Sequence, residues 1–520
     1  MMARPVDSDR VRAAASLGAL LLASGLLAAA LIALLAWPQG RTAGDLRLFC
    51  AAGIRVPIEQ IIADFEKDTG VQVDAQYEGS HDLLNKLKIY QVGDLYLAGD
   101  NSYIDQAVAT GLVREGITIA RMKPVIVVKA GSPAEQTIQS VDDLLAPGLR
   151  LSIGDPDKAA IGRKTKKLLS KSGHWPRLFA RVAENGATWG TVNDAANAVK
   201  IGSADAAIIW DAVARLPNYR EQLRIVEVPE LDAGEAAVTL GVCKFSKDTT
   251  TAHRFARYVT ASDRGLKIFK EHGWRTADGD PWDWNPTLHI YSGGVNRLAI
   301  EKTIHDWANR EGINVSTTFL GCGQLVSDMK AIRGGGKSQM FPAAYFACDL
   351  SYMQQVQGEF EDPVNLTSTR MVLLVHPKAQ GRIKSINDLA QANVRFGLAD
   401  KQFSALGLLT ERLLMSAGVW HRIPKDNFEA WTHTADMLVN QVKVGGLDAA
   451  IVYLANTTKV KDELVVLPID HPMAQATQPY AVAKGTPYKR TMQRLMRDLL
   501  SQQMTPAFEQ AGFRRLTGNP

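Results

Sequence analysis

The sequence predicts an α/β protein made of two similar units that follow each other along the chain. Short apolar stretches that suit buried strands alternate with amphipathic stretches that suit helices, a pattern typical of α/β units with a mainly parallel sheet. The same order of stretches then occurs a second time. With 520 residues the chain is too long for one ordinary core, and each unit is long enough for two lobes.

The duplication is clearest where two segments match without a gap. LFCAAGIRVPIEQIIADFEKDTGVQVDAQYEGS at 48–80 matches IYSGGVNRLAIEKTIHDWANREGINVSTTFLGC at 290–322. Each segment predicts a strand, a loop of small residues, a helix that ends at a glycine (Gly70 or Gly312), and a second strand. Further matches follow in the same order: 93–107 with 342–356, 138–162 with 383–407, and 191–210 with 434–453.

The predicted organisation has three parts. Residues 1–44 form an N-terminal tail and a membrane segment, residues 45–280 form the first unit (repeat 1), and residues 286–520 form the second (repeat 2). The stretch DGDPWDWNP at 278–286 is typical of a linker because it combines glycine, proline and aspartate.

The N-terminal region predicts a transmembrane anchor. Ala13 to Trp37 is uncharged and rich in leucine and alanine, and it is long enough to cross a bilayer. Arg4, Arg10 and Arg12 precede it, so the N-terminus is expected in the cytoplasm and the rest of the chain outside. A cleaved signal peptide followed by secretion is the alternative, although its apolar region is normally shorter.

Composition and motifs exclude several classes of function. The net charge is only +5 and no basic run alternates with aromatic residues, so no nucleic-acid partner is expected. The histidines show no metal-ligand spacing and no catalytic triad motif is present, so we expect no metal, no cofactor and no enzymatic activity. The cysteines fit no disulfide framework and are expected as buried apolar residues, with the disulfide state of the last two left open: Cys50, Cys243, Cys322 and Cys348.

Both repeats resemble the periplasmic solute-binding proteins of ABC transporters, in particular the molybdate- and tungstate-binding group. The resemblance rests on the stretches FCAAG, EKDTGVQV, YEGS, GDLYLAGD and GDPDKAAIGR, and on a last one that ends in ADAAIIW. It implies a type II periplasmic-binding-protein fold for each repeat, which is a hinged clamp of two lobes. In that family the ligand lies between the lobes and a permease recognises the closed form. The implied crossovers between lobes fall at 123–129, 226–242, 371–377 and 465–482.

The small-residue loops of this sequence suit an oxyanion. Small residues where a strand turns into a helix let backbone N–H groups approach a ligand, and a helix N-terminus adds partial positive charge. A site with donors only favours a fully ionised oxyanion over protonated phosphate, which needs an acceptor. The resemblance implies ligand contacts in repeat 1 at Ala52, Gly53, Gly79, Ser80, Ala160, Ile161, Val192 and Trp210. In repeat 2 the matching positions are Gly294, Val295, Gly321, Cys322, Ala405, Leu406, Ala435 and Tyr453.

Neither repeat holds the full set of hydroxyl donors implied by the resemblance. Repeat 1 keeps Ser80 but has Trp210 where relatives often have a tyrosine. Repeat 2 keeps Tyr453 but has Cys322 in place of the serine, and a thiol is a weak donor. Whether one repeat or both bind a ligand therefore stays open.

Charged residues close to these loops have simpler interpretations. Asp100 and Asp349 are expected to cap or brace a loop, with a role near the ligand as the alternative. The cluster Arg163, Lys164, Lys166 and Lys167 is expected to be a solvated helix face, with a permease contact as the alternative.

The leading hypothesis is a membrane-anchored, extracytoplasmic solute-binding protein that captures an oxyanion, molybdate or tungstate above others, for an ABC importer. Its expected partners are the anion, the ABC permease and, through the N-terminal helix, the membrane. The alternative is a membrane-anchored ligand sensor or scaffold with no transport role.

Overall fold

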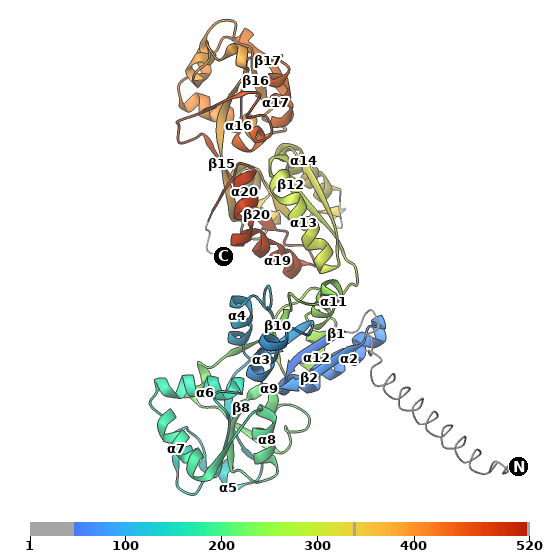
Figure 1. Cartoon of the computed structure of the whole chain (residues 1–520), viewed down its shortest axis with the longest axis vertical. Coiled ribbons are helices and arrows are strands. Elements are labelled where there is room, and N and C mark those ends of the chain that lie inside the picture. Colours follow the sequence, from blue (N-terminus) through green and yellow to red (C-terminus); the bar gives the residue numbers. More distant parts are fainter. Residues whose placement is uncertain (1–45, 336–339, 517–520) are drawn as a thin grey trace, which may run out of the picture.

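The structure is a computed structural model and describes residues 46–335 and 340–516. The predicted membrane segment lies outside these residues. Within the described ranges, no helix has the length and apolar character needed to cross a bilayer. The described chain forms an elongated molecule, with repeat 1 at one end and repeat 2 at the other (Figure 1).

The prediction of an α/β fold is confirmed by three mixed sheets. The first lobe of repeat 1 holds a six-stranded sheet of order β11-β4-β10-β3-β1-β2. Its strands are β1 (Leu46–Ala51), β2 (Val73–Glu78), β3 (Leu95–Ala98), β4 (Ile117–Met122), β10 (Ala236–Val242) and β11 (Arg275–Thr276). β1 runs parallel to β2 and β3, whereas β10 runs antiparallel to both of its neighbours.

The second lobe of repeat 1 holds a five-stranded sheet of order β7-β6-β8-β5-β9. Its strands are β5 (Pro124–Lys129), β6 (Leu151–Gly154), β7 (Gly186–Trp189), β8 (Ala206–Trp210) and β9 (Leu223–Val226). The chain passes between the lobes at Lys123, between β4 and β5, and returns between β9 and β10. Both crossings fall in the ranges implied by the family resemblance.

Repeat 2 has the same strand order, but its two sheets are joined into one. β15 is a single strand whose first part, up to Arg370, pairs with β20 and whose second part, from Met371, pairs with β18 and β19. The strands are β12 (Thr287–Gly293), β13 (Asn314–Leu320), β14 (Ala344–Phe346), β15 (Val364–Val375), β16 (Phe396–Ala399), β17 (Phe428–Thr432), β18 (Ala449–Tyr453), β19 (Val465–Pro468), β20 (Gln475–Val482) and β21 (Arg514–Arg515).

Helices flank the sheets in both repeats (Figure 1). Repeat 1 has α2 (Arg55–Thr69), α3 (Ser80–Tyr90), α4 (Asn101–Ala109), α5 (Pro133–Thr137), α6 (Ala160–Lys171), α7 (Trp175–Asn185), α8 (Val192–Lys200), α9 (Asp211–Ala214), α10 (Pro229–Asp232), α11 (Thr249–Val259) and α12 (Gly265–Glu271), with short 3-10 turns η1 (Ala52–Ile54) and η2 (Asp142–Leu145). Repeat 2 has α13 (Arg297–Glu311), α14 (Cys322–Gly334), α15 (Leu350–Gln354), α16 (Ala405–Ser416), α17 (Ala435–Lys443), α18 (Leu454–Thr457), α19 (Lys489–Leu500) and α20 (Thr505–Gln510). Its 3-10 turns are η3 (Gly294–Asn296), η5 (Gln357–Glu359), η6 (Pro377–Ala379), η7 (Ile386–Ala390), η8 (Trp420–Arg422), η9 (Lys425–Asn427) and η10 (Gln502–Met504).

The first long helix of each repeat ends as the sequence predicts. Gly70 follows α2 with φ of 75°, and Gly312 follows α13 with φ of 61°. This left-handed conformation costs glycine little and is strained for residues with a Cβ. The chain can therefore turn back at both points into the next strand of the sheet.

The two repeats meet through a buried cluster of charged residues (the interrepeat cluster). Arg494 of α19 donates to Glu115 of repeat 1 at 2.5 Å and to Glu311 at the end of α13 at 2.7 Å. His253 of α11 lies 3.5 Å from the Glu311 carboxylate, and Arg257 of α11 donates to the Glu311 carbonyl oxygen. Because Glu311 is fully buried, these contacts tie the first lobe of repeat 1 to the first lobe of repeat 2.

We expect the folded chain to lose stability as the solution becomes acidic, because the interrepeat cluster contains a buried histidine. Burial lowers the pKa of His253, whereas an unfolded histidine titrates near pH 6.5. Below about pH 6.5 the unfolded chain therefore binds more protons than the folded chain. The free energy of unfolding then decreases as the pH is lowered. We expect the melting temperature to drop as the pH falls below about 6.5, and His253→Gln to reduce this drop. A pH profile that is the same in the variant would contradict the assignment.

Candidate ligand-binding site

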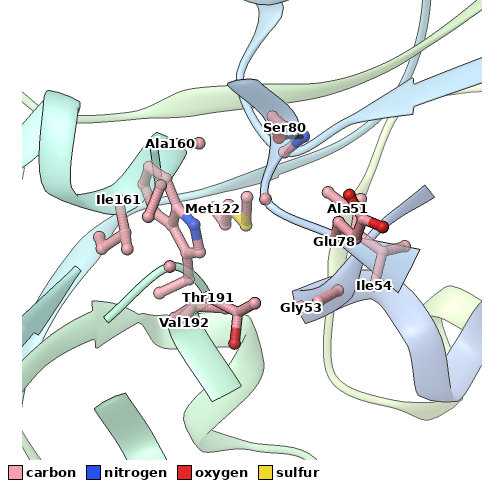
Figure 2. Close-up of a pocket in the computed structure, with 16 residues that line it drawn as sticks. Ala51, Gly53, Ile54, Glu78, Ser80, Met122, Ala160, Ile161, Thr191 and Val192 are labelled. Carbon is pink, nitrogen blue, oxygen red and sulfur yellow. Dashed lines mark hydrogen bonds between the residues drawn. The ribbon is translucent and has the colours of Figure 1, made fainter. Parts of the chain in front are cut away.

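A small pocket lies between the two lobes of repeat 1. All eight residues predicted as ligand contacts in this repeat line it, from Ala52 and Gly53 through to Val192 and Trp210. Figure 2 shows labelled residues from several separate loops around one central space. The cavity volume is about 30 Å³, and one water molecule needs roughly 10–15 Å³ on this measure. The pocket in this closed form suits a compact ion and is too small for a sugar or an amino acid.

Starts of helices from both lobes supply the polar groups of this pocket. Ala52 opens η1 and Ser80 opens α3 in the first lobe, while Ala160 opens α6 and Val192 opens α8 in the second. The first N–H groups of a helix have no partner within the helix, and η1, α3 and α6 receive no side-chain cap. Their N–H groups are therefore available to an anion, which the helix dipoles also favour.

Ser80 adds a hydroxyl donor to the backbone groups. Its side chain is buried, and its oxygen accepts a hydrogen bond from the backbone N–H of Gly99 at 3.2 Å. The hydroxyl hydrogen is therefore left to be donated to a ligand. The backbone oxygen of Ser80 accepts from the hydroxyl of Tyr96 at 2.6 Å, which fixes the position of the loop.

The electrostatics of the pocket come from the backbone and not from charged side chains. Among the described residues that line it, Glu78 is the only one with an ionisable side chain. Its carboxylate forms an ion pair with Lys86 on α3. A pocket of hydrogen-bond donors that has no cationic side chain in its lining can hold a dianion through helix N-termini and hydroxyl groups alone.

The lobes are closed around this pocket. The side-chain amide of Asn193, on α8, donates to the carbonyl oxygen of Ala52 in the other lobe at 2.8 Å. A Cβ added at Gly79 would lie 2.8 Å from the carbonyl oxygens of both Gly190 and Lys158. Only glycine allows the two lobes to approach this closely at residue 79.

Several pocket residues were not predicted from the sequence. They are Ala51, Ile54, Glu78, Gly99, Met122, Ala159, Gly190 and Thr191. Thr191 could have been found, because it caps α8 by accepting from the backbone N–H of Asp194, and the order T-V-N-D predicts such a cap. Met122 carries no such signal, because its place depends on how β4 crosses towards the second lobe.

In repeat 2 a disulfide occupies the position of the serine donor. Cys322 is bonded to Cys348, and these two residues match Ser80 and Gly99 of repeat 1. The disulfide state of this pair was left open by the sequence, and the preferred interpretation as isolated buried apolar residues does not hold for it. Cys50 and Cys243 are buried as expected, and both are free. A sulfur in a disulfide has no hydrogen, so Cys322 cannot donate one to a ligand.

The residue that faces the disulfide has changed with it. Gly293 stands where repeat 1 has Ala51, and a Cβ at this position would lie 2.7 Å from the Cys348 sulfur and 3.0 Å from the Cys322 sulfur. Repeat 1 has room at the corresponding position for the methyl group of Ala51. This methyl group lies 3.7 Å from a Cβ added at Gly99. Three neighbouring positions thus differ together between the repeats, which is the pattern expected if the disulfide is built into the loop.

The other predicted residues of repeat 2 have the same places in the fold as their counterparts. Gly294 and Val295 lie in η3, Gly321 precedes α14, Ala405 and Leu406 open α16, Ala435 opens α17, and Tyr453 ends β18. Gly321 faces the other lobe, because a Cβ there would meet the carbonyl oxygens of Phe403 and His433. The Tyr453 hydroxyl is buried and has no hydrogen-bond partner among the described residues. Burial raises its pKa well above the usual value, so it stays a donor.

The two aspartates near the loops cap helices, as predicted. Asp100 accepts from the backbone N–H of Ser102 at the start of α4, and Asp349 accepts from that of Ser351 at the start of α15. Each distance is 2.9 Å.

Two lobes joined by crossing strands define a solute-binding clamp, and this architecture is present twice. Repeat 1 holds the donor-lined pocket between its lobes. The chain belongs to the family of bacterial extracellular solute-binding proteins, whose model matches residues 46–275 and again residues 288–514. It is therefore a solute-binding protein of the ABC-transporter type in two tandem copies, similar to ModA proteins. The family binds solutes outside the cytoplasm, works with ABC permeases and is not enzymatic.

Individual relatives match one repeat's length of chain. A binding protein of Haemophilus influenzae is 29% identical over 235 residues, which covers 45% of this chain and 92% of the relative. The molybdate-binding protein ModA of Mycobacterium tuberculosis is 26% identical over 258 residues, covering 49% and 94%. Among solved structures, the periplasmic molybdate-binding protein of Azotobacter vinelandii matches with 16% identity and a TM-score of 0.37, covering 44% of this chain and 98% of that one.

Removal of the Ser80 hydroxyl tests the pocket directly. We expect Ser80→Ala to weaken anion binding by about 1–3 kcal/mol, because a bound oxygen then loses its donor inside a buried site. Isothermal titration of the full chain measures this change. Ser132→Ala is the control, because Ser132 precedes α5 and does not line the pocket. If Ser80→Ala and Ser132→Ala bound the anion with equal affinity, Ser80 would not be part of the binding site.

Proposed function

We propose that repeat 1 captures a tetrahedral oxyanion, molybdate or tungstate above others, and delivers it to an ABC importer. The observation that carries this proposal is the pocket itself, in which uncapped helix starts from both lobes and the Ser80 hydroxyl surround a space for one small ion. The proposed contacts are Ala52, Gly53, Gly79, Ser80, Ala160, Ile161, Val192 and Trp210. The molybdate-binding relatives add support at low sequence identity.

The choice of anion follows from the kind of groups in the pocket. Molybdate and tungstate are fully ionised near neutral pH and only accept hydrogen bonds, so a pocket of donors satisfies every oxygen. Protonated phosphate carries a hydrogen that needs an acceptor. Among the described residues that line the pocket, Glu78 has the one carboxylate, and Lys86 engages its Oε1. The pocket therefore favours the fully ionised anions over phosphate.

We propose that repeat 2 binds an anion more weakly than repeat 1, or not at all. Its candidate contacts are Gly294, Val295, Gly321, Cys322, Ala405, Leu406, Ala435 and Tyr453. The disulfide takes one directed donor out of this set, while the unpartnered Tyr453 hydroxyl remains as another. One tightly bound anion per chain is the expected stoichiometry.

The remaining parts of the proposal concern location. Residues 1–44 would hold the chain at the membrane, and residues 45–280 and 286–520 would be the two solute-binding domains outside the cytoplasm. A membrane-anchored sensor or scaffold is the second candidate, and the loss of a donor in repeat 2 is the observation that favours it.

Thermal melting of the full chain against a panel of oxyanions tests the function. A ligand that binds only the folded state raises the melting temperature by mass action. We expect a rise with molybdate and tungstate and a smaller one, or none, with phosphate. Sulfate, which is also fully ionised, separates selection by charge state from selection by size. No rise with any of these anions would contradict the proposed ligand class.

A further inference from the structure

Two basic residues of α6 reach across the cleft of repeat 1 to the start of α4. The Lys164 ammonium lies 2.7 Å from the Asp100 carboxylate, and the Lys164 side chain is only 20% exposed and that of Asp100 4%. Arg163 donates to the Ser102 hydroxyl, and its guanidinium carbon lies 4.0 Å from the centre of the Tyr103 ring. The expectation of a solvated helix face is therefore wrong for Arg163 and Lys164, because both are in contact with the other lobe.

The start of α4 fixes the orientation of the Asp100 carboxylate for this contact. One carboxylate oxygen accepts from the backbone N–H of Ser102 and caps α4, and the other oxygen faces Lys164. Burial acts to raise the pKa of Asp100, but hydrogen bonds from Lys164 and Ser102 outweigh it and hold the pKa below its usual value. The carboxylate is thus ionised and desolvated, a setting in which an ion pair is stronger than on an open surface.

The same helix carries part of the proposed ligand site. Ala160 and Ile161 open α6 and line the pocket, and Lys164 lies one turn further along. A movement that brings the start of α6 onto the ligand therefore brings Lys164 onto Asp100 as well. Closure of the clamp and formation of the ion pair are one motion.

Repeat 2 folds into the same clamp without this ion pair. Leu408 and Leu409 stand where repeat 1 has Arg163 and Lys164, while Asp349 keeps its capping role. Tyr352, the counterpart of Tyr103, donates instead to the carbonyl oxygen of Lys401 at 2.7 Å. The basic pair is therefore not required for the fold and is specific to the repeat with the intact donor loop.

We propose that Arg163 and Lys164, with Asp100, Ser102 and Tyr103, form an interlobe latch that sets how long repeat 1 stays closed. None of the latch residues is among the described residues that line the pocket, so the members of the latch are positioning residues. The effect on a bound anion rests on the proposed function, whereas the effect on closure does not. Apparent affinity scales with the fraction of closed molecules, so a weaker latch speeds release of the anion.

Distance measurements on the ligand-free full chain test the latch without any anion. Spin labels at Lys67→Cys on α2 and Lys171→Cys on α6 report the separation of the two lobes, since both positions are exposed. We expect Arg163→Ala with Lys164→Ala to shift the distances to larger values. Lys166→Ala with Lys167→Ala, on the exposed face of the same helix, is the matched control and should leave them unchanged. Unchanged distances in the latch variant would overturn the proposal.

The second experiment measures the rate at which molybdate is released from the latch variant and from the parent chain. We expect the latch variant to release the anion about tenfold faster with little change in the association rate, and Lys164→Arg to restore slow release. Equal release rates in the variant and the parent would overturn the link between latch and ligand. Larger lobe distances in a chain that binds none of the anions would uphold the latch and contradict the proposed function.

Discussion

Gly79→Val is expected to abolish anion binding by repeat 1 while both lobes stay folded. The backbone at Gly79 has φ of −63° and ψ of 143°, which valine adopts without strain. A Cβ there, however, would lie 2.8 Å from carbonyl oxygens of Gly190 and Lys158, which belong to the backbone of the other lobe. The added side chain would therefore hold the lobes apart and separate the donors of α3 from those of α6 and α8.

Isothermal titration should show a loss of at least about 100-fold in affinity, or about 2.7 kcal/mol. Solution scattering should show a more open molecule. Gly358→Val in repeat 2 is the control, because a Cβ there has no neighbour within 4 Å. Wild-type affinity in Gly79→Val would mean that the anion does not bind between the closed lobes.

Glu311→Ala is expected to have the largest effect on stability. Burial acts to raise the pKa of Glu311, but the charges of Arg494, His253, Arg310 and Arg257 outweigh it and lower the pKa to about 2. Removal of this carboxylate leaves the buried Arg494 with only Glu115 as a partner. Breaking a buried ion pair costs about 3–5 kcal/mol because the remaining charge stays desolvated.

Calorimetry should show this loss as a lower melting temperature, and the two repeats should separate more readily. Glu301→Ala, on the exposed face of the same helix where Glu301 pairs with Arg297, should cost less than about 1 kcal/mol. If Glu311→Ala and Glu301→Ala had the same melting temperature, the interrepeat cluster would contribute nothing to holding the two repeats together.

The fold of repeat 1 could be predicted from the sequence because the chain is duplicated, and its candidate contacts could be predicted because both repeats resemble a known family. A loop such as GS at 79–80 is weak evidence alone, but its counterpart at 321–322 falls at the same place between a strand and a helix. The family resemblance implied ligand contacts at 52–53, 160–161 and 192, and these loops converge on one pocket. Strand-to-helix turns are local, so sequence order predicts them.

Contacts between lobes and between repeats could not be predicted in this way. Lys164 reads as an exposed residue of a basic helix, and nothing in its neighbourhood of the sequence points to Asp100. The disulfide was hidden because repeat 1 has a serine and a glycine at the matching positions, so comparison of the copies suggested no pair. The partners of Glu311 come from α11 and α19, and Arg494 of α19 also pairs with Glu115 in a loop of repeat 1. Only the assembled chain brings these elements together.

Isothermal titration of the full chain with molybdate tests the central claim most directly, which is that repeat 1 is a closed clamp for one oxyanion. The account predicts heat of binding with one tight site per chain, and its loss in Gly79→Val. Absence of heat with molybdate, tungstate, sulfate and phosphate would contradict the claim. A tight site that survives in Gly79→Val would contradict the assignment of that site to repeat 1.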